Sequence, residues 1–164
     1  MTIHIRRLGP GDEDLLARIA GEADDFDVPG GSEPEEPLPP HEAAAYLRDP
    51  AVVHWVAEDD GLLVGELLCH VLRLPSGAGR ELLLYSIGVR SSRRRTGIGR
   101  ALVEEMLAWA RAEAVQDVWV LADNLGAAAF YEACGFIRGE RGSDPVYYQR
   151  RVDGESAGAP VSAT

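Results

Sequence analysis

The sequence predicts an α/β protein built on a mixed, mostly antiparallel β-sheet with helices on both faces. Strand-like and helix-like apolar patterns succeed one another along the 164 residues, with three consecutive strands in the middle and a strand, helix, strand order after them. Consecutive strands favour antiparallel pairs, whereas a helix between two strands favours a parallel pair joined by a right-handed crossover. We therefore expect six or seven strands and about four helices.

The N-terminal half begins with an apolar alternation and a capped helix. Ile3, Ile5 and Leu8 alternate as in a strand, and residues 9–12 predict a turn whose last residue, Asp12, is a helix N-cap. The expected elements are, in order, a strand at 3–8, a helix at 12–22, a proline-rich acidic loop at 24–40, a helix at 41–48 and a hairpin of strands at 52–57 and 62–74.

The C-terminal half centres on an apolar run that leads through arginines and glycines into an amphipathic helix. Ile98, Leu102 and Met106 share one stripe of that helix. The expected elements are a strand at 81–89, helices at 98–112 and 126–133, a strand at 118–121 between them, and one or two last strands at 136–140 and 146–152. We expect one domain over residues 1–152 and a disordered tail over 153–164.

The amino-acid composition argues against several classes of function. The net charge of -11 argues against nucleic-acid binding and favours cationic partners. All sixteen basic residues are arginine, which excludes Schiff-base chemistry through a lysine. The two cysteines and four histidines show no metal-ligand spacing, so no metal is expected. No apolar run is long enough to cross a bilayer and no signal peptide is visible, so we expect a cytoplasmic protein without membrane contact.

The segment from Arg90 to Arg100 is typical of a phosphate site. A strand that turns through glycines into a helix presents unpaired backbone amides at the positive end of the helix dipole. Arg94 and Arg95 are the side chains that we expect at the phosphates, whereas Arg100 points outward or meets a further phosphate. A charge run on a solvated face is the alternative interpretation. The expected ligand is a nucleotide cofactor.

Two blocks of this sequence carry a family resemblance. The first is Arg94, Gly97 and Gly99, and the second runs over residues 124–136, with matches at Asn124, Ala127, Tyr131, Gly135 and Phe136. In this order the blocks resemble those of the GNAT acetyltransferase superfamily, and the resemblance covers about residues 3–152. It implies the GNAT fold, with acetyl-CoA in a V where the strand ending at Val89 and the strand ending at Asp123 splay apart.

The resemblance also implies which residues bind the cofactor. Backbone at Ile87 and Val89 would pair with the pantetheine arm, an amide near Ile87 would polarise the thioester carbonyl, and amides from Arg95 to Arg100 would hold the pyrophosphate. The full set of expected cofactor-binding residues is Ile87, Gly88, Val89, Arg94, Arg95, Thr96, Gly97, Ile98, Gly99, Arg100, Asn124 and Tyr131. Asn124 either contacts the pantetheine or caps its helix, and the two roles are compatible.

Tyr131 and Glu81 are the expected catalytic residues. A phenol on the helix beside the cofactor can protonate the departing thiolate, although Phe130 and Tyr131 could also be a simple core pair. Attack requires a neutral amine, so a carboxylate or water chain must remove a proton from a group whose pKa is about 10. Glu81 opens the central strand and is the leading candidate base. The other candidates are Asp123, Glu66 and His70.

Within the superfamily, the N-terminal half is most similar to type I aminoglycoside 3-N-acetyltransferases. The similar stretches are residues 26–29, 46–50 and 56–57. Those enzymes typically have Tyr-Asp near the end of the central strand, where this chain has Tyr85-Ser86, so another acid compensates or the substrate differs. The expected substrate-binding residues are Asp25, Asp27, Tyr85, Ser86 and Asp123.

Three functions remain open at this point. One is N-acetylation of an aminoglycoside or similar polyamine, to which the acidic loop would be attractive, although such a loop could serve solubility alone. The second is N-acetylation of a peptide amine, and the third is acetyl-CoA binding without turnover. A homodimer is a further expectation, with Tyr147 and Tyr148 on the last strand as the place to look for a partner.

Overall fold

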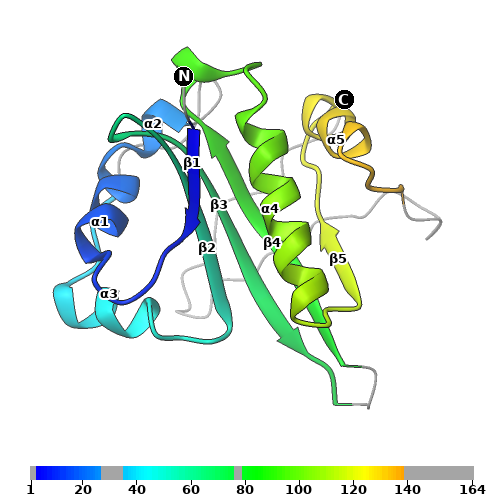
Figure 1. Ribbon diagram of the computed structural model, residues 1–164, viewed down its shortest axis with the longest axis horizontal. Coiled ribbons are helices and arrows are strands. Elements are labelled where there is room, and N and C mark those ends of the chain that lie inside the picture. The colour runs from blue at the N-terminus through cyan, green and yellow to red at the C-terminus, as the bar shows by residue number, and fades with distance from the viewer. Residues whose placement is uncertain (1–2, 27–34, 76–78, 139–164) are drawn as a thin grey trace, which may run out of the picture.

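A computed structural model of the chain describes residues 3–26, 35–75 and 79–138 (Figure 1). In this part of the chain one sheet has the strand order β1-β2-β3-β4-β5. Its strands are β1 (Ile3–Arg7), β2 (Val52–Asp59), β3 (Leu62–Arg73), β4 (Arg80–Val89) and β5 (Asp117–Val120). The first four strands pair antiparallel, and β4 pairs parallel with β5. The mixed, mostly antiparallel sheet is thus confirmed.

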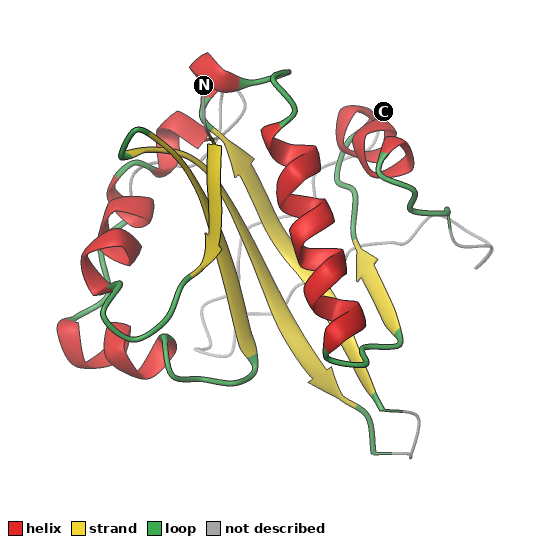
Figure 2. Cartoon of the chain, viewed as in Figure 1, coloured by secondary structure: helices red, strands yellow, loops and turns green. Residues whose placement is uncertain are grey.

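Helices lie on both sides of the sheet (Figure 2). They are α1 (Glu13–Gly21), α2 (Ala23–Phe26), α3 (Pro40–Tyr46), the 3-10 turn η1 (Ser91–Arg93), α4 (Ile98–Ala112) and α5 (Leu125–Ala133). Helix α2 falls in the segment expected to be a loop, because the buried ring of Phe26 gives this short acidic stretch an anchor in the core. None of the described helices combines the length and apolar character needed to cross a membrane.

The expected count of six or seven strands is not met. The described residues form five strands, and residues 136–138, part of an expected strand, are irregular. The expected last strand at 146–152, with Tyr147 and Tyr148, and the expected tail at 153–164 lie outside the described residues.

Strand β2 shows how the two faces are covered. Trp55 and Ala57 pack in a cluster with Leu102 of α4, whereas Val56 between them packs in a second cluster with Leu15 of α1 and with Phe26. Successive side chains of a strand point to opposite faces. Helix α4 therefore covers one face and α1 and α2 cover the other, as the sequence predicts.

Strand β4 is bulged and then loses its parallel neighbour. Leu68 pairs with Ser86 while the next residue of β3, Cys69, pairs with Leu84, so Tyr85 is an extra residue in β4. Pairing with β5 ends at Leu84, yet β4 continues to Val89. A bulge bends its strand and increases the local twist. The two strands thus part after Leu84, as the resemblance implies, although β5 ends at Val120, one residue before the predicted 121 and three before the Asp123 implied by the resemblance.

Close packing of α4 on β3 leads to the first testable prediction. A methyl group on Gly65 would lie 2.9 Å from Ile98 Cγ2 and 3.0 Å from Leu102 Cδ1, inside the fully buried core. Overpacking of this kind costs about 1–3 kcal/mol. Gly65→Ala should therefore lower the free energy of unfolding by that amount in urea denaturation. Gly21→Ala is the matched control, because nothing lies within 4 Å of its added methyl group.

A second prediction concerns the turn before α1. The carboxylate of Asp12 accepts hydrogen bonds from Arg6 Nη1 at 2.9 Å, Arg6 Nη2 at 2.8 Å and the Gly9 amide at 2.9 Å, instead of capping α1 with its side chain. The Arg6 hydrogen bonds lower the pKa of Asp12 below its ordinary 3.8, with the Gly9 amide adding to the effect and desolvation opposing it. The ionised form therefore contributes stability above the unfolded pKa, and this contribution is lost as the pH falls through the lower folded value.

The expected consequence is a pH-dependent effect of Asp12→Asn. At pH 7 the variant should be less stable by about 1 kcal/mol in urea denaturation. At a pH below the lowered folded pKa, where Asp12 is protonated in both the folded and the unfolded protein, the difference should disappear. A difference that stays constant from pH 7 to that lower pH would contradict an electrostatic origin.

Candidate active site

The start of helix α4 presents free amides at its positive end. Gly97 is the N-cap residue with φ 89°, and the first hydrogen bond into the helix in the described chain runs from the Ala101 amide to the Gly97 carbonyl oxygen. The preceding Arg95 also has a positive φ of 60°. An α-helix leaves its first amides without internal partners, and this geometry favours an anion. Diphosphate binding by the amides from Gly97 to Arg100 stays a prediction with which this geometry is compatible.

Gly99 has a different reason to be glycine. A Cβ there would lie 3.3 Å from the Phe130 ring and 3.5 Å from Val89 Cγ2. The missing side chain lets α4 approach α5 and the end of β4. In the block of Arg94, Gly97 and Gly99, the first glycine thus permits the backbone conformation of the turn and the second permits close packing of the helices.

The arginines around this turn divide into two groups. Arg93 pairs with the buried Asp59 at 2.9 Å, and Arg94 donates to the carbonyl oxygens of Val89 at 3.2 Å and Phe26 at 3.1 Å. The side chains of Arg95 and Arg100 have no ion pair or hydrogen bond within the described residues, and both residues are exposed. Phosphate contact by Arg95 or Arg100 is thus open to their side chains, whereas the Arg94 side chain joins β4 to α2.

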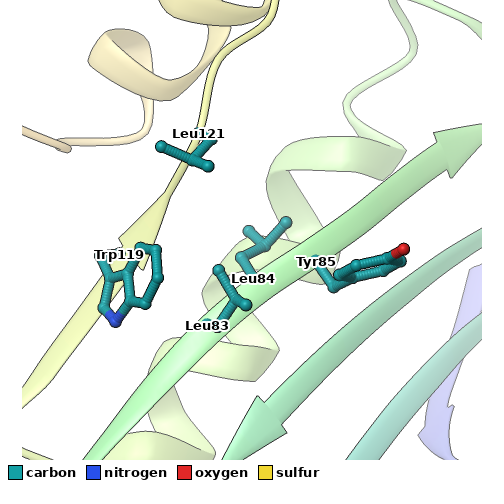
Figure 3. Close-up of a pocket in the computed structure, with 5 residues that line it drawn as sticks. All are labelled: Leu83, Leu84, Tyr85, Trp119 and Leu121. Carbon is teal, nitrogen blue, oxygen red and sulfur yellow. The ribbon is translucent and has the colours of Figure 1, made fainter. Parts of the chain in front are cut away.

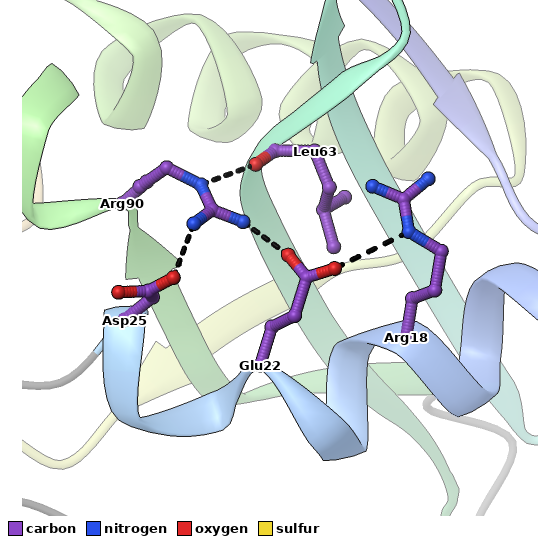
Figure 4. A network of polar contacts seen from close by, with 5 residues as sticks. All are labelled: Arg18, Glu22, Asp25, Leu63 and Arg90. Atoms are coloured by element: carbon purple, nitrogen blue, oxygen red, sulfur yellow. Dashed lines mark hydrogen bonds and ion pairs between the residues drawn. The ribbon is translucent and has the colours of Figure 1, made fainter.

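Arg90 fastens the N-terminal helices to the end of β4 (Figure 4). Its guanidinium pairs with Glu22 and Asp25, its Nε donates to the Leu63 carbonyl oxygen at 2.8 Å, and its charge lies 5.1 Å from the centre of the Phe26 ring. Asp25 was expected to bind substrate, but here its carboxylate neutralises Arg90. Asp27, expected in the same role, lies outside the described residues.

An apolar hollow opens where the pairing of β4 and β5 ends. Its lining residues are Leu83, Leu84, Tyr85, Trp119 and Leu121. Figure 3 shows the side chains of Trp119 and Leu121 on the β5 side and those of Leu83 and Leu84 on the β4 side, with Tyr85 next along β4. Leu121 and Tyr85 are 65% and 68% exposed, so the hollow is open to solvent. An extended apolar chain would bury these side chains.

Tyr131 lies at the edge of the core on α5. It packs edge-on against Phe130 and Phe136, with ring centres 5.4 Å and 5.7 Å away. Gly135, with φ 89°, ends α5 in a Schellman motif in which the Phe136 amide bonds the Tyr131 carbonyl oxygen at 3.0 Å. The motif places Phe136 against Tyr131. The matching glycine and phenylalanine of the second block therefore hold the tyrosine in position.

The Tyr131 hydroxyl is available to a ligand. It has no hydrogen-bond partner in the described part of the chain, where the only fully buried unpaired side-chain oxygen is Asp59 Oδ1. The Tyr131 oxygen must therefore keep contact with solvent. Burial of the ring, and then the charge of Asp123, raise the pKa of Tyr131, so the phenol keeps its proton at neutral pH.

Asn124 caps helix α5. Its Oδ1 accepts from the Ala127 amide at 2.8 Å and its Nδ2 donates to Asp123 Oδ1 at 2.8 Å. The capping interpretation is confirmed, and contact with a cofactor stays a prediction. Asp123 is exposed and lies directly before this cap.

Glu81 lies at the opposite end of β4 from the phosphate turn. It pairs with Leu72 and with Asp117. Eight residues separate it from Val89, about 26 Å along an extended strand. A role as base stays a prediction, and Glu81 would have to act near the hollow rather than near α4.

A group of hydrogen-bonded polar side chains lies on the sheet face away from α4, and the sequence predicts a role for only part of it. Glu66 was among the candidate bases, but its partners His54 and Tyr46 were not singled out. His54 Nε2 lies 3.1 Å from Glu66 Oε2, and His54 Nδ1 lies 3.0 Å from the Tyr46 hydroxyl. Glu66 Oε1 lies 3.5 Å from Ser86 Oγ. A histidine between apolar neighbours on β2 was the only local signal.

Comparison with known proteins agrees with this geometry. Residues 20–136 match the Acetyltransferase (GNAT) family. N-acetyltransferase 8 of Rattus norvegicus is 34% identical over 94 residues, which are 56% of this chain and 42% of that protein. The chain thus spans less than half the length of this relative.

Solved structures share the fold across nearly the whole chain. An aminoglycoside acetyltransferase from an uncultured soil metagenomic sample, in complex with trehalose, has a TM-score of 0.72 at 21% identity and covers 90% of this chain and 97% of its own. A ribosomal-protein-alanine N-acetyltransferase from Brucella melitensis has a TM-score of 0.66 at 19% identity, covering 90% and 100%. A predicted acetyltransferase from Clostridium acetobutylicum, solved with acetyl-CoA, has a TM-score of 0.66 at 17% identity, covering 88% and 96%.

These comparisons define the class of protein. The sheet that splits beside an open helix N-terminus is an acetyltransferase scaffold. The chain belongs to the GNAT acetyltransferase family. GNAT acetyltransferases use acetyl-CoA as their acetyl donor, and the matched relatives include N-acetyltransferases.

Proposed function

We propose that the chain transfers an acetyl group from acetyl-CoA to a primary amine of a cationic small molecule, with the 3-amino group of an aminoglycoside as the preferred acceptor. The main support is the stretch of β4 from Tyr85 to Val89, which borders β3 on one edge but has no β5 partner on the other within the described residues, and which lies shortly before the open N-terminus of α4. This arrangement offers strand-edge backbone for an extended arm and a positive helix end for a diphosphate.

The residues on either side of this stretch have separate tasks. Acetyl-CoA, when bound, supplies the activated thioester. The amides from Gly97 to Arg100 hold its diphosphate, and backbone near Ile87 orients its arm and polarises the carbonyl. Tyr131 donates its phenolic proton to the departing sulfur. The hollow beside Tyr85 offers apolar side chains against which the bound arm packs.

The charge of the chain and its structural similarity to aminoglycoside acetyltransferases support a cationic acceptor. The net charge of -11 favours a cation, and aminoglycoside acetyltransferases are among the structures with this fold. A peptide N-terminus is the second candidate, because a ribosomal-protein-alanine N-acetyltransferase also shares the fold. Binding without turnover is disfavoured by the Tyr131 hydroxyl, which has no hydrogen-bond partner within the described residues and can therefore donate to a ligand.

One assay separates the three functions. Release of free CoA thiol is measured with sisomicin, with spermidine and with an alanine-initiated peptide, each against a control without acceptor. Turnover of sisomicin with acetylation at the 3-amino group in the product supports the proposal. Turnover of the peptide alone supports the second candidate. Acetyl-CoA binding by calorimetry without turnover of any of the three amines would overturn the proposed function.

A further inference from the structure

Glu66 lies on the face of the sheet away from α4, and hydrogen bonds hold its carboxylate in place. Its side chain is 13% exposed and that of His54 is 6% exposed. A carboxylate can only accept hydrogen bonds, so the proton of their 3.1 Å contact must be on His54 Nε2. The Tyr46 hydroxyl satisfies the other ring nitrogen at 3.0 Å. Burial, and then the Glu66 charge, raise the pKa of Tyr46 to about 12, so this phenol stays neutral. The contacts of His54 with Glu66 and with Tyr46 therefore hold Glu66 Oε2 in place.

The other oxygen of Glu66 faces the part of β4 that continues beyond its pairing with β5. Its contact within the described residues is the Ser86 hydroxyl at 3.5 Å, the upper limit of a hydrogen bond. Glu66 pairs across the strands with Gly88, whose missing Cβ would lie 3.2 Å from Oε1 and 3.0 Å from Phe26 Cβ. A side chain at position 88 would press on the carboxylate. Small residues at 86 and 88 thus let Oε1 and the Phe26 side chain lie directly against β4.

The location matches the needs of the acceptor amine. Ser86 directly follows the bulged Tyr85, which lines the apolar hollow, and Ile87 lies between Ser86 and Gly88. Successive side chains alternate, so Ser86 and Gly88 face Glu66 whereas Ile87 packs toward the α4 core. Ser86 and Gly88 therefore face the Glu66 carboxylate of β3, and the other edge of this stretch of β4, beyond the end of β5, is where the cofactor arm would lie.

We propose that Glu66, positioned by His54, is the catalytic carboxylate that binds the acceptor ammonium and removes its proton, an inference that rests on the proposed acetyl transfer. The ammonium gives one proton to Glu66 Oε1. The neutral nitrogen then forms a bond to the acetyl carbon, the carbon–sulfur bond breaks, and the sulfur keeps that electron pair. Tyr131 protonates the sulfur, the second nitrogen proton is lost to solvent as the amide forms and Tyr131 regains a proton from solvent, and Glu66 releases its own proton to solvent.

The test uses an isosteric pair. Glu66→Gln keeps an oxygen that can accept from His54 but removes the charge, whereas Glu105→Gln removes one charge from an exposed position on α4. Initial rates with sisomicin, spermidine and the alanine-initiated peptide are measured from pH 6 to pH 10, together with the acetyl-CoA Kd from calorimetry. For Glu66→Gln we expect kcat/KM for the amine to fall about 100-fold or more at pH 7. The loss should shrink toward pH 10, where free amine accumulates, and the acetyl-CoA Kd should stay within about twofold.

A rescue variant separates catalysis from folding. Because Ser86 Oγ lies 3.5 Å from Glu66 Oε1, an aspartate at position 86 places a carboxylate close to the same point. Glu66→Gln combined with Ser86→Asp should regain at least tenfold of the lost rate at pH 7, which a structural role would not predict. The inference is overturned if Glu66→Gln stays within about threefold of wild type, or if it loses acetyl-CoA binding, since the carboxylate would then be structural. A wild-type protein that binds acetyl-CoA but acetylates no amine overturns the proposed function instead.

Discussion

Gly97→Asp is expected to weaken acetyl-CoA binding by about 30- to 100-fold, while Gly97→Asn stays within a few-fold of wild type. The site accepts both side chains, because nothing lies within 4 Å of a Cβ built on Gly97. Asparagine and aspartate tolerate the positive φ of 89° better than other residues, and both are good N-caps. The two variants therefore differ mainly in one negative charge.

The magnitude follows from the distance to the diphosphate. Two unit charges about 5 Å apart repel by about 3 kcal/mol at an effective dielectric constant of about 20, and salt reduces this to about 2 kcal/mol at an exposed position. Calorimetry with acetyl-CoA measures the effect. Acetyl-pantetheine, which lacks the diphosphate, is the control ligand and should not distinguish the two variants. Equal affinity of both variants for acetyl-CoA would place the diphosphate away from α4.

The parts of the site that the sequence predicts best are those set by neighbouring residues. Gly97 and Ile98 mark the start of α4 as expected, and the hairpin turn is a two-residue loop with positive φ at Asp60 and Gly61. Such turns require the residues that adopt positive φ, so the signal is local. The end of α5 at Gly135 is of the same kind.

The roles of the arginines could not be predicted in this way. Arg90 pairs with Glu22 and Asp25, which precede it by 68 and 65 residues. Only the packing of α1 and α2 against the end of β4 brings these charges together. A cluster of arginines in sequence thus divides in space, with Arg90, Arg93 and Arg94 bound within the protein and Arg95 and Arg100 left at the surface.

The proximity of Glu66 to Ser86 could not be predicted from local sequence either. Ser86 in place of an expected aspartate indicated a missing carboxylate, but the register of β3 against β4 supplies Glu66 beside it. That register includes the bulge at Tyr85, which shifts every later pairing by one residue. Sequence alone gives the alternation within a strand and not the partner across it.

Tyr131→Phe should reduce kcat by about 100-fold and leave the acetyl-CoA Kd unchanged. The hydroxyl is the only group removed, and general-acid catalysis of a departing thiolate contributes about this much or more. Because burial raises the pKa of Tyr131, the wild-type donor stays protonated to higher pH than an ordinary tyrosine. The wild-type kcat should therefore show no decline from loss of this proton up to about pH 10.

Tyr131→Leu separates this role from packing between Phe130 and Phe136. Both variants lack the hydroxyl, but only the leucine leaves space between these rings, which should cost about 1–3 kcal/mol of stability in urea denaturation. If the hydroxyl is the cause, kcat falls to a similar level in both variants while stability falls mainly in the leucine variant. Full activity of Tyr131→Phe with a loss confined to Tyr131→Leu would show that Tyr131 is a core residue, and the proton for the thiolate would have to come from solvent.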